Sequence, residues 1–176
     1  MIPEKPNIPT EIINDAKSRW KTYTLTAETH AAVIETDKVF FEELLHVWAL
    51  SDFIPKICLR NPDLLTDLFE SKHLFDIYPH HFYRKRLERL LNDFDPGATS
   101  HLTHAQLTNQ IPVLQQLVRT FRQREMVRIA WRDLSGRADL AETMADLSAF
   151  ADACIDCSLL VLYNLHCCVD GIPRCL

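Results

Sequence analysis

The sequence predicts an all-α fold, a multi-helix bundle that ends in a long helix. Three glycines in 176 residues leave little material for tight hairpins, phosphate-binding loops or Rossmann turns. Helix-start residues recur at helical intervals, and apolar residues at helical spacing lie between them. A chain of this length can bury one sizeable core. We expect residues 1–25 to form an extended leader and a short helix, and residues 26–176 to form one helical domain.

The first half of the chain predicts three helices and two clear breaks. Thr10 is a candidate cap for a short helix that reaches about Tyr23, and Thr26 for a longer one that reaches Leu50. The longer segment has an apolar face made of Val39, Phe40, Leu44, Val47 and Trp48. A turn follows at Ser51-Asp52. Asn61-Pro62 then starts a helix that runs to about Phe69, because proline at the first helical position loses no hydrogen bond.

Proline and polar caps also divide the middle of the chain. Pro79 is expected to begin a helix that ends near Leu91, before the turn at 95–97. The pattern Thr103-x-x-Gln106 predicts a capping box at the start of the next helix. Pro112 should kink or restart that helix, since it removes a backbone donor.

The last helix is predicted to be unusually long. Gly136 supplies a stop for the preceding helix, and Asp139-x-x-Glu142 starts one that reaches about Cys167, roughly 43 Å away. Its first half should turn one set of side chains toward the core: Leu140, Met144, Leu147, Ala151, Cys154 and Ile155. Its second half is apolar on every side over 159–165, a pattern typical of complete burial. Either this domain or a further domain covers it.

Residues 117–134 carry the main candidate site, an arginine row made of Arg124, Arg128 and Arg132 at i, i+4 and i+8. Like charges at this spacing repel by about 0.2–0.5 kcal/mol per pair, so the row needs a partner. The apolar stripe also rotates along this segment, which predicts two packing partners for one helix. We expect the row to hold acids of neighbouring helices or to form an interdomain surface. Phosphate binding is the alternative.

Other chemical motifs are weak. Five of the six cysteines lie in the last 23 residues, but Cys157 and Cys167 on one helix are about 15 Å apart, too far to share a zinc ion. We expect buried, reduced thiols, with Cys175 the most reactive if it is exposed. Asp93 and Asp95 resemble a metal-binding pair but fit a helix end. The pair His80-His81 lacks a third ligand nearby, so we predict no catalytic, cofactor or metal site.

Charge limits the classes of partner. The net charge of −5 argues against general binding to nucleic acid or to anionic membranes, which requires a clustered positive field. The apolar segment of the last helix is too short to span a bilayer. The amino-terminal residues 1–9 show no secretory signal pattern, so the sequence predicts a cytoplasmic protein without a membrane or nucleic-acid partner.

Several ordered segments resemble a known family. Residues 121–134, followed by 139–155, look like the amino-terminal region of the bifunctional glutamine synthetase adenylyltransferase/adenylyl-removing enzymes. Residues 47–54 and 61–68 resemble the opening helices of that family, and His166-Cys167 with Gly171-Ile172-Pro173 resembles its link to the first catalytic domain. The resemblance extends over about Phe40 to Pro173.

The resemblance implies a helical part of an enzyme that adds adenylyl groups to a tyrosine of glutamine synthetase and removes them by phosphorolysis. ATP and Mg²⁺ are then expected cofactors of the full-length enzyme, and glutamine synthetase and the remaining domains are expected partners. The family's Gly-Ser-x-Asp-x-Asp motif is absent from this sequence. We therefore expect this chain alone to be inactive. A non-enzymatic helical scaffold or protein-interaction module is the alternative.

Overall fold

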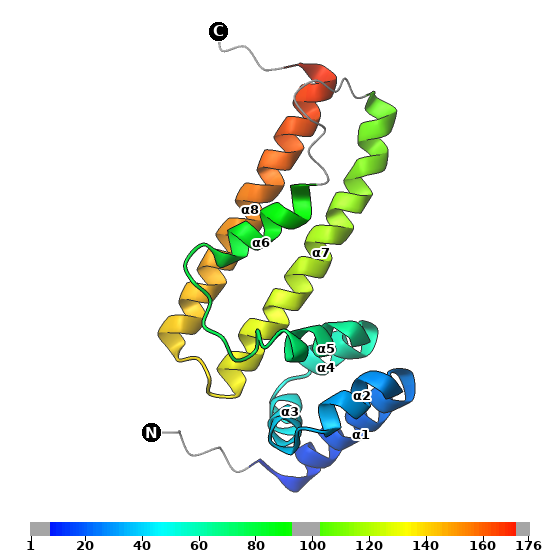
Figure 1. Cartoon of the computed structure of the whole chain (residues 1–176), viewed down its shortest axis with the longest axis vertical. Helices are drawn as coiled ribbons and strands as arrows, with labels where there is room; N and C mark the ends of the chain where they lie inside the picture. Colours follow the sequence, from blue (N-terminus) through cyan, green and yellow to red (C-terminus); the bar gives the residue numbers. More distant parts are fainter. Residues whose placement is uncertain (1–7, 93–102, 172–176) are drawn as a thin grey trace. The chain divides into compact units, whose positions relative to one another are not determined.

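A computed structural model describes residues 8–92 and 103–171, and within them every element is an α-helix. These described residues form eight helices and no strand (Figure 1). The all-α fold predicted from the scarcity of glycine is confirmed.

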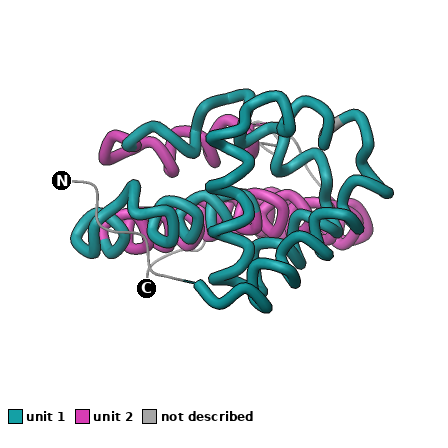
Figure 2. Tube along the Cα trace, turned by 90° about the horizontal axis from the view of Figure 1, so that it is seen from below, with its two compact units in different colours: residues 1–77, 124–144 teal, residues 78–123, 145–176 magenta. Residues whose placement is uncertain are grey.

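The described residues gather into two compact units (Figure 2). Unit 1 contains residues 1–77 and 124–144, and unit 2 contains residues 78–123 and 145–176. The two long helices, α7 (His104–Leu134) and α8 (Leu140–Asp170), each contribute to both units. The division into 1–25 and 26–176 drawn from the sequence stays a prediction.

Unit 1 opens with three helices: α1 (Thr10–Thr26), α2 (Glu28–Glu35) and α3 (Lys38–Leu50). The single helix predicted from Thr26 to Leu50 is wrong. The chain breaks before Lys38 because the Asp37 carboxylate caps α3 and accepts a hydrogen bond from Phe40 N at 3.0 Å. Thr10 is the first residue of α1 rather than its cap, a position held by Pro9.

Helices α4 (Phe53–Arg60) and α5 (Pro62–Glu70) follow the predicted breaks. Ser51 Oγ accepts a hydrogen bond from Ile54 N at 3.3 Å, which fixes the turn into α4. Pro62 occupies the first position of α5, as predicted from Asn61-Pro62, but the Asn61 side chain makes no capping hydrogen bond.

The core of unit 1 is rich in aromatic rings. Trp20 stacks on Tyr23 with ring centroids 5.1 Å apart, and Phe40 stacks on Trp131 of α7 at 5.2 Å. Most of the predicted apolar face of α3 is buried, but Val39 is 76% exposed and was wrongly included. Since Trp131 and Val127 belong to the same core cluster as the first five helices, α7 completes this core.

Helix α7 begins at the predicted capping box. Thr103 N donates to Gln106 Oε1 at 2.8 Å, and Gln106 N donates to Thr103 Oγ1 at 3.3 Å. The helix continues through Pro112 to Leu134, so a restart at Pro112 is wrong. Proline at this position removes one backbone N–H donor from the helix.

The turn between α7 and α8 has the predicted stop and start. Gly136 has φ of +72°, and the following Arg137 N donates back to Arg132 O at 2.8 Å. Asp139 then caps α8 by accepting a hydrogen bond from Glu142 N at 2.8 Å.

Unit 2 combines α6 (Phe82–Leu91) with the first part of α7 and most of α8. Helix α6 starts three residues after the predicted Pro79. Phe150 of α8 is its central ring, with Tyr83 of α6 at 5.9 Å and Phe121 of α7 at 6.1 Å.

The predicted core face of α8 is wrong. Leu140, Met144 and Ile155 are 74%, 55% and 58% exposed, and the buried apolar residues of α8 are instead Phe150, Ala153, Cys157 and Leu165. Helix α8 is apolar on more than one side, so its periodicity alone does not select the side that meets a neighbour. Leu159 and Leu160, in the apolar segment for which the sequence left open cover by this domain or by a further one, are 60% and 54% exposed, so the described part of this chain does not cover them.

Candidate functional site

The arginine row lies at the carboxy-terminal end of α7, inside unit 1. Arg124, Arg128 and Arg132 are all buried, and Arg128 and Arg132 are at most 1% exposed. Burial of a guanidinium is costly unless its donors are satisfied. The neighbouring groups therefore determine what the row can do.

Arg128 and Arg132 hold the segment 72–76 that follows α5. Arg128 donates to the carbonyl oxygens of His73 at 2.9 Å and Asp76 at 2.5 Å, and Arg132 donates to the carbonyl of Leu74 at 3.1 Å. These bonds satisfy carbonyl groups that the end of α5 and the following turn leave without helical partners. Two guanidinium groups thus fix three backbone positions of one irregular segment.

The segment needs this support because its backbone turns sharply. Lys72 has φ of +58°, a left-handed conformation that is uncommon for a residue other than glycine. Phe75 N donates to Lys72 O at 2.9 Å, which closes the turn.

Carboxylates complete the row. Arg124 donates to Asp67 of α5 at 2.6 Å and to the fully buried Glu125 at 2.7 Å. Arg132 donates to Glu142 of α8 at 2.6 Å. The row therefore contacts both acids and backbone carbonyls, and Arg128 and Arg132 lack the solvent access that a diffusible phosphate would need.

A second buried ionic centre surrounds Glu43 on α3. Trp131 Nε1 donates to Glu43 Oε1 at 2.8 Å, while Arg137 donates to both carboxylate oxygens at 2.9 and 2.6 Å. The Arg137 guanidinium also lies 4.5 Å from the ring centroid of Phe75, a cation–π distance. Sequence reasoning missed Glu43. Its signal is an acid on the apolar face of α3, one turn after Phe40.

The remaining motifs form no site among the described residues. In residues 8–92 and 103–171, no group of three or more His, Cys, Asp or Glu side chains is arranged to hold a metal ion. Cys58 is fully buried, which raises the pKa of its thiol to about 12, and burial also raises the pKa of Cys157. Cys154, Cys167 and Cys168 are half-buried and form no disulfide within the described part of the chain. Asp93, Asp95 and Cys175 lie outside the described residues.

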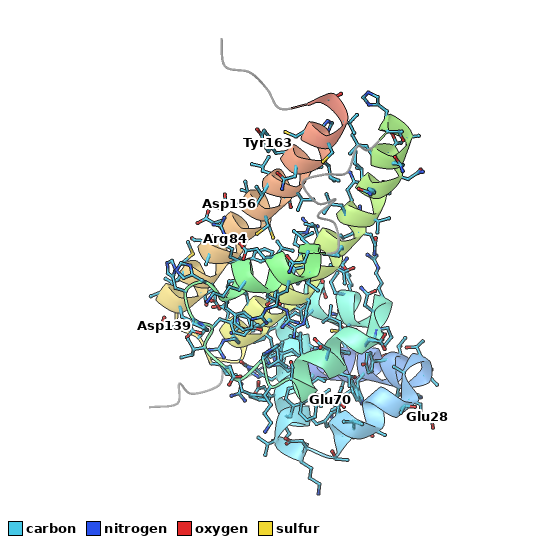
Figure 3. The ribbon with its side chains drawn as sticks, turned by 45° about the horizontal axis from the view of Figure 1, so that its top comes forward. Glu28, Glu70, Arg84, Asp139, Asp156 and Tyr163 are labelled. Atoms are coloured by element: carbon cyan, nitrogen blue, oxygen red, sulfur yellow. The ribbon has the colours of Figure 1, made fainter. Side chains whose placement is uncertain are left out.

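His80 and His81 stand directly before α6, with their Nδ1 atoms 3.3 Å apart. Both line a surface pocket of about 430 Å³ in unit 2, together with residues of α8. Arg84 of α6 bridges to Asp156 of α8 at 3.0 Å beside this pocket (Figure 3). An exposed pair of this kind adds little stability.

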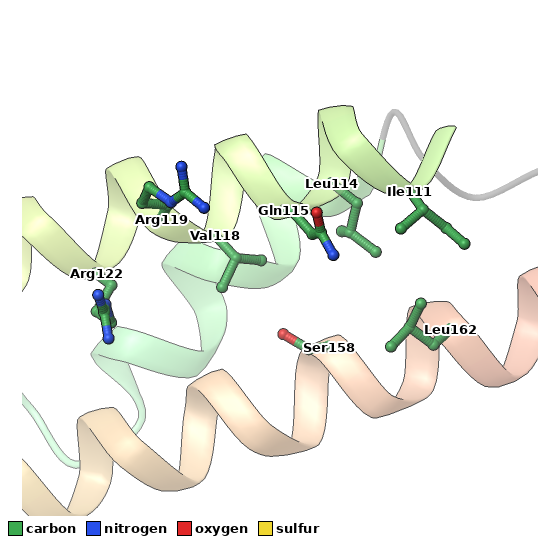
Figure 4. Close-up of a pocket in the computed structure, with 8 residues that line it drawn as sticks. All are labelled: Ile111, Leu114, Gln115, Val118, Arg119, Arg122, Ser158 and Leu162. Carbon is green, nitrogen blue, oxygen red and sulfur yellow. The ribbon is translucent and has the colours of Figure 1, made fainter. Parts of the chain in front are cut away.

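A groove separates α7 from α8 in unit 2 (Figure 4). It encloses about 470 Å³, and its apolar lining comes from Ile111, Leu114, Val118 and Leu162. Arg119 and Arg122 line it at the end away from Ile111. No sequence motif predicted this groove. In the described part of the chain, no helix is both long and apolar enough to cross a membrane.

Comparison with known proteins decides the family. The model of the glutamate-ammonia ligase adenylyltransferase family matches residues 41–174, about three quarters of the chain. This chain belongs to that family. The match includes the arginine row and Glu43, so both buried ionic centres lie within the adenylyltransferase-like region.

Individual relatives agree with the family model. The chain is 39% identical over 127 residues to the bifunctional glutamine synthetase adenylyltransferase/adenylyl-removing enzyme of Nitrosococcus oceani. This alignment covers 72% of the chain and 12% of the relative. The enzymes with the same name from Pseudomonas aeruginosa and Pseudomonas syringae pv. tomato are 35% and 32% identical over 132 and 170 residues. These alignments cover 75% and 96% of the chain but 12% and 16% of the relatives. No solved structure matches the chain.

Proposed function

We propose that this chain provides an amino-terminal helical region of an enzyme that adenylylates glutamine synthetase and removes the adenylyl group again. The full-length enzyme would transfer an adenylyl group from ATP, with Mg²⁺, to a tyrosine hydroxyl of glutamine synthetase and release pyrophosphate. Phosphate would reverse the modification and release ADP. Family membership over residues 41–174 is the observation that supports this proposal.

The chain's own part in this function is structural. The arginine row uses charged donors to fix the segment 72–76 against α7, and the Glu43 centre fixes α3 against α7. Such buried networks hold elements at fixed positions, which a region that supports neighbouring catalytic domains requires. Glutamine synthetase and the rest of the longer enzyme are the partners this role implies, in the cytoplasm.

Exchange of matched segments tests the proposal. Residues 41–174 would replace the aligned segment in the Nitrosococcus oceani enzyme, and the chimera would be assayed for adenylylation of glutamine synthetase and for ADP release by phosphorolysis. We expect at least one activity to be retained, whereas deletion of the segment should abolish or greatly reduce it. A folded chimera that lacks both activities, beside an active parent enzyme, would contradict the proposal.

The isolated chain should be inactive. We expect no ADP when it is incubated with adenylylated glutamine synthetase, phosphate and Mg²⁺, because phosphoryl-transfer catalysis depends on metal-holding carboxylates that position the phosphates. ADP release above a blank after repeated purification would contradict this expectation.

A further inference from the structure

The groove between α7 and α8 has a divided lining. On α7, the apolar side chains of Ile111, Leu114 and Val118 occupy one stretch, and Arg119 and Arg122 follow (Figure 4). The apolar stretch and the two arginines are centred about 9 Å apart along the helix. An occupant that fits this lining carries apolar and acidic side chains in the same order and at a similar spacing.

The two arginines are available for such an occupant. Both are exposed, and neither has an ion-pair or hydrogen-bond partner in the part of the chain that the structure describes. By contrast, Arg84 and Arg124 both contact carboxylates. Two unpaired cations one turn apart repel each other, and a carboxylate placed between them would relieve that repulsion.

One face of α8, which adjoins α6 at its acidic end, has the required chemistry. At 100° per residue, six positions fall on one side of the helix: Asp152, Ile155, Asp156, Leu159, Leu160 and Tyr163. The four apolar members are 52–60% exposed, and α8 contains no lysine or arginine. Figure 3 labels two members of this acidic-apolar face, Asp156 and Tyr163. Asp156 also bridges to Arg84 of α6 at 3.0 Å, and both acids line the pocket that contains His80 and His81. Because an exposed pair of this kind adds little stability, the incoming arginines would share these carboxylates with Arg84.

The spacing of this face matches the groove. Its acids and its apolar residues are centred about 8 Å apart along α8, close to the corresponding distance of about 9 Å along α7. Acids meet arginines when the incoming α8 runs antiparallel to α7. This is the arrangement of adjacent helices in an up-and-down four-helix bundle.

We propose that a second copy of this chain occupies the groove, with α8 of each copy packed against α7 of the other. The two helix pairs then form a symmetric four-helix bundle. Two-fold symmetry makes the contact twice: Arg119 and Arg122 of each copy face Asp152 and Asp156 of the other. Burial of the half-exposed leucines, isoleucine and tyrosine supplies most of the free energy, and the charges fix the register.

Sedimentation of the intact 176-residue chain over a range of concentrations tests the proposal. We expect a monomer–dimer equilibrium that weakens as salt is raised. The double substitution Arg119→Glu and Arg122→Glu should weaken dimerisation at least tenfold, as should Asp152→Arg with Asp156→Arg. The matched control, Lys85→Glu with Arg89→Glu on exposed positions of α6, makes the same change in net charge outside the groove and should leave the equilibrium unchanged.

A charge-swap mixture gives the sharper result. Each double variant opposes like charges in its homodimer, but a mixture of the two restores opposite charges at both contacts. We expect the mixture to form a heterodimer of near wild-type affinity, measured by native mass spectrometry, and circular dichroism will verify that both variants are folded.

Three outcomes would overturn the proposal. A wild-type chain that stays monomeric at several hundred micromolar would leave the groove to another protein or to another part of a longer chain. Dimers that persist in both charge-reversed variants would place the contact elsewhere. Folded variants that fail to form the heterodimer would exclude the pairing of these arginines with these acids.

Discussion

Replacement of Arg128 by alanine is the most direct test of the arginine row. Arg128 is fully buried and donates to the carbonyls of His73 and Asp76. Each hydrogen bond from a charged group contributes about 1.5–3 kcal/mol, so the loss of both should lower the free energy of unfolding by about 3–6 kcal/mol. With a urea m-value of about 1.5 kcal/mol/M, the midpoint should fall by at least about 2 M.

The chain offers a specific optical probe for this experiment. All three tryptophans, Trp20, Trp48 and Trp131, belong to unit 1, where Arg128 lies. Tryptophan fluorescence during urea unfolding therefore follows the unit that contains the substitution, whereas far-ultraviolet circular dichroism follows the helices of both units.

Two further variants separate the possible causes. Arg128→Met keeps most of the side-chain volume but leaves the two carbonyls without a charged donor, and it should also lose about 3 kcal/mol. Arg60→Ala removes an exposed arginine from the same unit and should change stability by less than about 0.5 kcal/mol. If Arg128→Ala and Arg60→Ala unfold at the same urea concentration, the row does not hold the segment 72–76.

Four other changes test separate features. Glu43→Ala should lower the stability of unit 1 by about 2–3 kcal/mol and shift its tryptophan emission to the red, because a buried indole N–H and a guanidinium lose their acceptor. Burial raises the pKa of Tyr23 from 10.0 to about 12. Its contribution to the free energy of unfolding is therefore present below pH 10 and is lost as the pH rises toward 12. Stability should then fall by up to about 1.4 kcal/mol per pH unit over that range, and Tyr23→Phe should flatten the slope measured by urea titration. Gly136→Ala should lower the free energy of unfolding by about 1 kcal/mol, measured by thermal denaturation, because φ is +72° at this position. In native protein, iodoacetamide followed by peptide mass analysis should leave the buried Cys58 thiol unmodified at pH 8.

The local signals of the sequence predicted helix ends better than helix faces. The capping box at Thr103 and Gln106 and the proline start at Pro62 depend only on neighbours in the chain, and both are confirmed. The break at Asp37 follows the same capping rule but lies in a polar stretch, residues 35–38, that also fits the solvent side of one longer helix. Met144 and Ile155 were assigned to the core because α8 is apolar on several sides, and only tertiary packing selects one of them.

The chemistry of the arginine row was less predictable. Its spacing on one helix showed that partners were needed, and the acid partners of Arg124 and Arg132 fit that expectation. The acceptors of Arg128 are backbone carbonyls more than fifty positions earlier in the chain. Because every residue type has the same carbonyl group, no residue identity in the sequence could indicate that contact.

The discontinuous composition of unit 1 has a consequence for synthesis on the ribosome. Val127 and Trp131 belong to the same core cluster as the first five helices. The first segment of unit 1 ends at Ile77, but its second segment is complete only at Met144. Translation of the 67 residues from 77 to 144 takes roughly 3–13 s at about 5–20 residues per second. For that interval the nascent helices expose an aromatic surface, and they are then natural clients for a chaperone at the tunnel exit.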